Sequence, residues 1–125
     1  MELNLIKTDL VNIGEIELIQ ELDGYRFPNR VYKNYIWNTN NNRNLSYEDA
    51  KKKLIRNIVL GVEARMIKGM EHKKVYYYGC LQIHVNINEK SICYIKNNFK
   101  GVFPWNVNAD KIHILNEIMG IEGDK

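Results

Sequence analysis

Apolar residues recur every fourth position in the segment that starts at Ser46, and this spacing predicts the longest helix of the chain. The repeating residues are Ala50, Leu54, Ile58, Val62 and Met66. They fall on one helical face. "SYED" supplies a serine with an acid three residues on, which is close to a capping box, and Lys68-Gly69 is a typical helix end. We predict a helix of about 23 residues, roughly 34 Å long.

Two shorter segments also have helical spacing. In residues 9–22 the apolar residues Leu10, Ile13, Ile16 and Ile19 recur every third position, Thr8 or Asp9 supplies a cap, and Gly24 supplies an end. Because residues 13–19 also alternate as a strand would, both structures stay open there, and we favour the helix. Near the C-terminus, Asn108 or Asp110 begins a short helix that Gly120 ends, with Ile112, Leu115 and Met119 facing inward.

Residues 75–87 alternate between apolar and polar side chains, which indicates a strand. The apolar side holds Val75, Tyr77, Gly79, Leu81, Ile83, Val85 and Ile87, and the other side holds Tyr76, Tyr78, Cys80, Gln82, His84 and Asn86. We predict one strand of about 13 residues that bends at a bulge on Gly79, since most strands are shorter. A turn near residues 88–90 and a returning strand at 91–96 complete a long hairpin.

The aromatic and β-branched residues between Pro28 and Trp37 predict a further strand at residues 30–37. A polar loop follows at residues 38–44, and residues 99–108 form a loop or a short strand. Together these elements predict a single α+β domain spanning residues 1–125. Its small antiparallel sheet carries a long β-hairpin that packs on one long helix, and a short C-terminal helix completes it.

Composition narrows the class of protein. The chain has 125 residues, of which 45% are apolar and 26% charged, which is typical of a globular domain. No apolar run reaches the ~18 residues of a membrane span, and the first residues do not resemble a secretion signal, so we expect a cytoplasmic protein that does not interact with membranes. The abundance of Asn, Ile and Lys is typical of AT-rich coding, which suggests a low-GC bacterium or its phage or mobile elements.

Several chemistries are disfavoured. The chain has neither G-x-x-x-x-G-K nor G-x-G-x-x-G, so an enzyme dependent on ATP or NAD is not expected, and we predict no cofactor. Cys80 and Cys93 are offset along the hairpin and should be free thiols. Cys80 and His84 lie ~13 Å apart on one strand, too far to hold one metal ion. Cys93 could face His84 in one register, which alone is weak support for a nucleophile.

The polar side of the hairpin is the candidate binding surface. Tyr76, Tyr78, Gln82, His84 and Asn86 would offer stacking and hydrogen-bonding groups to a nucleotide or short nucleic acid. Arg26, Arg30 and Arg43 would contact phosphates. The net charge of +3 is too mild to indicate nucleic-acid binding by itself. The same residues are also what the solvated side of an ordinary sheet would carry.

A protein partner is another possibility. Trp37, Phe103 and Trp105 lie in or beside loops, where exposed aromatic residues often anchor interfaces, although they could equally close the ends of the core. A tyrosine-rich sheet face also suits a two-fold homodimer. We therefore expect a small non-enzymatic binding or inhibitor protein of bacterial or phage origin, which holds a nucleotide, a short nucleic acid or a host defence protein and forms a homodimer.

The alternative is a metal-independent ribonuclease. His84 and His113, with lysine, arginine and tyrosine residues nearby, are the groups that general acid–base cleavage of RNA needs. In size and in its expected α+β build the chain resembles the small bacterial toxins of the RelE type. That resemblance implies catalysis by basic and aromatic residues spread over a sheet.

Overall fold

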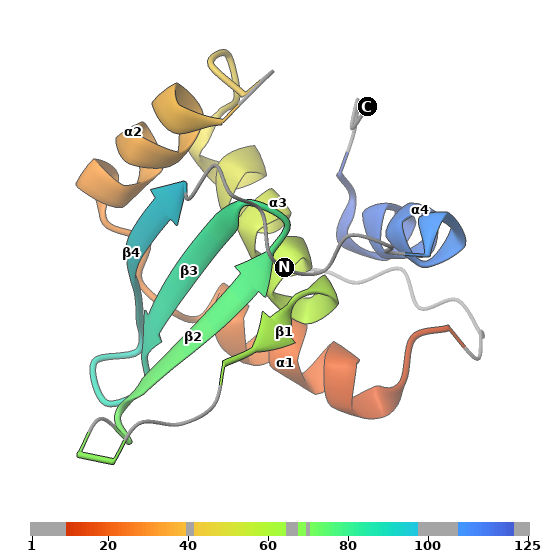
Figure 1. The fold of residues 1–125 in the computed structure, drawn as a ribbon. Coiled ribbons are helices and arrows are strands. Elements are labelled where there is room, and N and C mark those ends of the chain that lie inside the picture. Colours follow the sequence, from red (N-terminus) through yellow and green to blue (C-terminus); the bar gives the residue numbers. More distant parts are fainter. Residues whose placement is uncertain (1–9, 40–41, 65–67, 70, 98–107, 122–125) are drawn as a thin grey trace.

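A computed structural model describes residues 10–39, 42–64, 68–69, 71–97 and 108–121. Over these residues the fold is mixed α+β, as predicted. It consists of four helices and one antiparallel four-stranded sheet with the strand order β1-β2-β3-β4 (Figure 1). The helices are α1 (Ile13–Asp23), α2 (Asn29–Asn38), α3 (Tyr47–Leu60) and α4 (Ala109–Met119); the strands are β1 (Val62–Glu63), β2 (Lys73–Tyr78), β3 (Leu81–Asn86) and β4 (Ser91–Asn97).

The helices cover one face of the sheet, and α3 is the central element of the core. α3 contacts α1, α2, α4 and β2, and it lies behind the strands in Figure 1. Its side chains at Leu54, Ile55 and Ile58 are fully buried, as are Ile83 and Ile92 on the sheet. Burying side chains of this size stabilises the fold by roughly 1.5–3 kcal/mol each. None of the described helices is long and apolar enough to cross a membrane.

The two short helices are confirmed, with one change of cap. α1 begins at Asn12 instead of Thr8 or Asp9: the Asn12 side chain accepts from the Glu15 backbone at 2.8 Å, and the Glu15 carboxylate accepts from the Asn12 backbone at 3.1 Å. This reciprocal pair is a full capping box, and the strand alternative is wrong. α4 begins after Asn108 and ends at Gly120, whose φ of 69° lies in the left-handed region.

The predicted strand at residues 30–37 is wrong, because this segment forms α2. Pro28 caps the helix with its carbonyl, which accepts from Val31 and Tyr32 at 2.9 and 3.0 Å. Val31, Tyr35 and Ile36 are buried together. Their helical spacing places all three against the core, and burial of that face outweighs the preference of aromatic and β-branched residues for strands.

The helix that begins at Ser46 is confirmed at its start and is shorter than predicted. The Ser46 hydroxyl accepts from the Asp49 backbone at 3.2 Å, but α3 ends at Leu60, well before Lys68-Gly69. Gly61 then carries the chain into β1. A Cβ atom at Gly61 would lie 2.8 Å from the carbonyl oxygens of both Asn57 and Tyr77, so only glycine allows this close passage of helix and sheet.

The predicted single strand of residues 75–87 is two strands, β2 and β3. Tyr78 pairs directly with Leu81, so only Gly79 and Cys80 form the turn. Gly79 has a φ of 58°, and glycine at the first of two turn positions is the arrangement that type II′ hairpin turns use. The second turn lies at residues 87–90 and the returning strand β4 follows it, as predicted.

Side chains of α2 cover the outer edge of β4. Arg30 Nη1 donates to the Cys93 carbonyl at 3.4 Å, and Asn34 Nδ2 donates to the Ile95 carbonyl at 3.0 Å. The Asn97 side chain donates in turn to the last residue of α2. Four residues of a helix rise about 6 Å and two residues of a strand about 6.6 Å. Side chains four apart on α2 can therefore reach carbonyls two apart on β4. This edge is therefore not free to pair with another strand.

The close approach at Gly61 yields a prediction for stability. Gly61→Ala should lower the free energy of unfolding by about 1–3 kcal/mol, since two backbone carbonyls would have to move. Gly24→Ala is the matched control, because its Cβ would meet the Glu21 carbonyl at an ordinary 3.4 Å and its φ of −81° suits alanine. Chemical denaturation of both variants measures the difference, and equal midpoints would contradict the steric explanation.

Candidate functional site

One face of the sheet is left open by the helices. Side chains of directly opposed residues share a face, and the cross-strand pairs therefore define this open face. It consists of Val62, Lys73, Val75, Tyr77, Gln82, His84, Asn86, Tyr94 and Lys96, together with the buried Ser91 opposite Asn86. In Figure 1 the open face looks toward the viewer, and the described helices lie behind or beside the sheet.

The predicted placement of Tyr76 and Tyr78 is wrong. Tyr76 pairs with Ile83 and Tyr78 with Leu81, so both tyrosines belong to the covered face. Tyr76 is only 6% exposed, and its burial, together with the nearby Glu63 carboxylate, raises the pKa of its phenol. The two-residue turn causes this change. On one continuous strand, residues that share a face differ by an even number, but the turn pairs Tyr78 with Leu81, so residues that share a face across it differ by an odd number.

Gln82, His84 and Asn86 do lie on the face opposite to the core, as predicted. The aromatic positions beside them are Tyr77 and Tyr94, which the sequence reasoning missed. A signal for Tyr77 was present in the chain: glycine followed by one residue between two apolar-polar runs is the pattern of a tight hairpin, and it fixes the register of both strands.

Four side chains form a continuous network across three strands of the open face. Gln82 Nε2 donates to the Tyr77 hydroxyl at 3.1 Å, and Gln82 Oε1 lies 2.9 Å from His84 Nε2. With the amide in this orientation, a neutral His84 ring donates from Nε2. The His84 and Tyr94 rings meet edge to face with centroids 4.9 Å apart. Strands and mutual contacts thus hold three rings in fixed positions.

The charge on the open face is positive. Lys73 stands at the start of β2, and Lys96 stands on the edge strand β4. Arg26 continues the row of Asn86 and Ser91, because a backbone bridge joins it to Ser91. Acidic side chains are absent from the strand positions that define this face. Burial and, to a smaller extent, Lys73 lower the pKa of His84, which favours its neutral imidazole.

Of the three candidate arginines, one lies beside the open face and two lie outside the sheet. Arg26 is exposed and points to the open side, since the buried Tyr25 and Phe27 on either side of it point to the core. Arg30 and Arg43 are not on the sheet. Arg30 lies in the first turn of α2, at the edge of β4.

Trp37 and Arg43 form a pair on the α2 side of the molecule. The Arg43 guanidinium carbon stands 5.0 Å from the centre of the Trp37 ring, and Trp37 is 60% exposed. The other two candidate interface residues, Phe103 and Trp105, lie outside the described residues.

The remaining titratable candidates are not brought together. Both cysteines are free thiols, as predicted. Cys93 donates from Sγ to the backbone carbonyl of His84 at 3.5 Å and not to its ring. His113 is exposed on α4, where its Nε2 lies 2.8 Å from Glu117 Oε1. Since α4 packs on α3, on the covered side of the sheet, His113 does not join His84.

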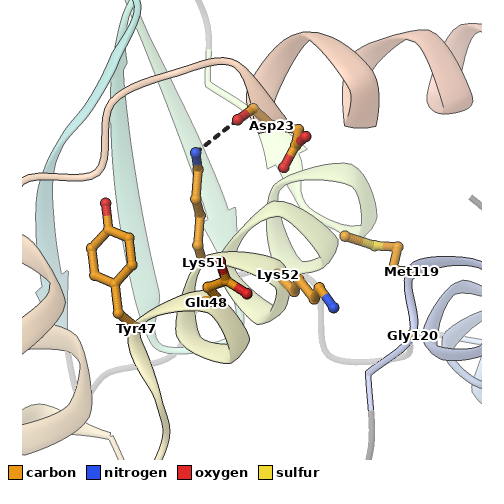
Figure 2. A pocket seen from close by; sticks show the side chains of 7 residues that line it. All are labelled: Asp23, Tyr47, Glu48, Lys51, Lys52, Met119 and Gly120. Carbon is orange, nitrogen blue, oxygen red and sulfur yellow. Dashed lines mark hydrogen bonds between the residues drawn. The ribbon is translucent and has the colours of Figure 1, made fainter. Parts of the chain in front are cut away.

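A cavity of about 430 Å³, which sequence reasoning did not predict, lies between the ends of three helices (Figure 2). Its lining consists of Asp23, Tyr47, Glu48, Lys51, Lys52, Met119 and Gly120. Lys51 Nζ donates to the Asp23 carbonyl at 2.7 Å. Lys52 Nζ reaches the C-terminal end of α4 at Gly120. Because α1 and α4 have no basic residue in their last turns, these lysines compensate the negative helix ends.

Comparison with known proteins identifies one family. The sequence model of the family described as YorE matches residues 25–117, which include the described sheet, α2, α3 and most of α4. No curated protein and no solved structure matches the chain.

The environment of His84 predicts a pH dependence of stability. Because its pKa in the folded protein is lower than the ordinary value of 6.5, the unfolded chain takes up a proton that the folded protein resists, and the folded state loses stability as the pH falls below about 6.5. His84→Gln should therefore lose less thermal stability than wild type between about pH 7.5 and pH 5.5. His113→Gln is the control for loss of an exposed imidazole. Parallel pH curves for wild type and His84→Gln would contradict this account.

Proposed function

The chain belongs to the YorE family, and we propose that it is a small phage-related binding protein that holds the bases of a nucleotide or short nucleic acid on its open face. The form of the family name is that of a phage gene and suggests the phage-related origin. The observation that carries the binding proposal is the Tyr77–Gln82–His84–Tyr94 network, which spans β2, β3 and β4.

Pre-ordered aromatic rings favour the proposal. Stacking of one base on an aromatic side chain contributes roughly 1–3 kcal/mol and requires little net charge. Tyr94 is 45% exposed, so a base can reach its ring. The Tyr77–Gln82–His84 hydrogen bonds order this part of the face before any ligand arrives, which lowers the entropic cost of binding. Amide, hydroxyl and imidazole groups beside the rings can pair with the edges of a base.

The distribution of charge also favours it. Lys73, Lys96 and Arg26 stand at the margins of the face, and the uncharged rings occupy its middle. That arrangement matches a ligand whose bases stack in the centre and whose phosphates lie outside. A host protein with an acidic surface is the second candidate partner. A two-fold homodimer that buries the same rings is a further use of the face that we propose to test.

The test is isothermal titration calorimetry with adenine and uridine mononucleotides and with short single-stranded oligonucleotides. Tyr94→Ala should weaken binding about tenfold, because a stacking partner is lost. Ile13→Ala is the matched control: it also removes an exposed apolar side chain, 76% accessible, but on α1. Native mass spectrometry of the same samples reports bound ligand and oligomeric state together.

Three outcomes would contradict the proposal. The first is that no nucleotide or oligonucleotide binds, and the second is that Tyr94→Ala and Ile13→Ala bind alike. The third is cleavage of RNA in EDTA that His84→Ala abolishes, which would favour the ribonuclease. The specific observation behind that alternative is the lowered pKa of His84, whose ring lies against Tyr94, because a neutral imidazole suits a general base.

A further inference from the structure

We infer that the ligand of the open face is a single strand of nucleic acid several nucleotides long, which passes over the edge of β4 and continues along α2 to a second stacking position at Trp37. This inference rests on the proposed function, and it specifies the class of ligand and the path that it takes. It depends on the side chains of α2, on the Trp37–Arg43 pair and on a separation of charge within the molecule.

The outward side of α2 continues the open face. Arg30, Lys33 and Trp37 follow one another at spacings of three and four, so they form one stripe on the helix. Within that stripe Arg30 itself bonds to the edge of β4, and the stripe as a whole lies away from the buried side at Val31 and Tyr35. It therefore looks out on the same side of the molecule as Tyr94 and Lys96 on the neighbouring strand. Figure 1 shows α2 directly beside β4.

Trp37 has the properties of a stacking platform. It is the largest side chain on the stripe and is 60% exposed, although burying it would stabilise the fold. Arg43, which comes from the segment after α2, holds its guanidinium 5.0 Å from the centre of the ring. Because this guanidinium lies over one face of the ring, a base would stack on the other face, and the guanidinium offers the phosphate a forked donor.

Positive charge is concentrated on this side of the molecule. Residues 24–47 contain four basic residues and no acidic one. The basic residues of this flank are Arg26, Arg30, Lys33, Arg43, Lys90 and Lys96, and the acid beside them is Glu89 in the turn before β4. Outside this flank, 12 of the 18 basic residues of the chain remain against 14 of its 15 acidic ones. The mild net charge of +3 thus conceals a basic flank on an otherwise acidic molecule, as a polyanion track requires.

The length dependence of binding tests the path. Fluorescence anisotropy with labelled oligothymidylate and oligouridylate should show affinity rising from a trinucleotide to a strand of about 12 nucleotides. Trp37→Ala should weaken binding of the longer strand about tenfold and leave the trinucleotide unaffected. Tyr94→Ala should weaken both. Comparing the oligothymidylate series with the oligouridylate series shows whether the protein prefers single-stranded DNA or single-stranded RNA.

The salt dependence tests the basic stripe with a matched pair of variants. Each phosphate contact on a single strand contributes about 0.7 to the slope of log affinity against log salt. Lys33→Gln should therefore reduce that slope by about 0.7 for the longer strand. Lys68→Gln removes the same charge from an exposed position between β1 and β2 and should leave the slope unchanged.

The outcomes separate this inference from the proposed function. If Tyr94→Ala weakens binding but affinity does not rise with length, or Trp37→Ala has no effect, the path along α2 is wrong and the open face stands as the site. If neither series binds, the proposed function fails and this inference fails with it. If Trp37→Ala converts a dimer to a monomer without changing oligonucleotide binding, Trp37 serves self-association and the inference is overturned.

Discussion

The candidate site depends on one constraint of antiparallel sheets: residues that stand opposite each other present their side chains on the same face. The two-residue turn at Gly79 and Cys80 sets which residues of β2 and β3 are opposed. It thereby sends Tyr76 into the core and Tyr77 to the open side. Had the chain run on as one bent strand, the hydrogen bond between Gln82 and Tyr77 could not form across neighbouring strands, and the network that orders His84 and Tyr94 would lose one end.

The contact between α2 and β4 serves both the fold and the proposed path. An uncovered edge strand exposes carbonyl groups that invite pairing with another chain. Arg30 and Asn34 occupy two of these carbonyls, and the helix can do so along its length because its rise over four residues matches two residues of strand. The packing of α2 against β4 also places the exposed Lys33 and Trp37 at the border of the sheet. The contact that protects the edge strand therefore also extends the open face.

Charge shows how composition can mislead when it is summed over a whole chain. The net charge of +3 is the small difference between 18 basic and 15 acidic residues, and by itself it says little about which partners the protein binds. The attraction of a polyanion depends on the local field, which falls off within about 10 Å at ordinary ionic strength. The fold brings Arg26 from before α2 beside β4, and it places Arg43 against Trp37. The acidic residues are left mostly on other elements.

The sequence by itself determined the class of fold, the cap at Ser46, the second turn of the sheet and the outward direction of His84, because each follows from local spacing or from a local hydrogen bond. Only the tertiary structure decided that residues 29–38 are helical, that α3 ends at Gly61 and that Tyr77 replaces Tyr76 on the open face. Those outcomes depend on which surface the rest of the chain offers for burial and on backbone contacts between residues far apart in sequence. Spacing along a single segment carries no information about either.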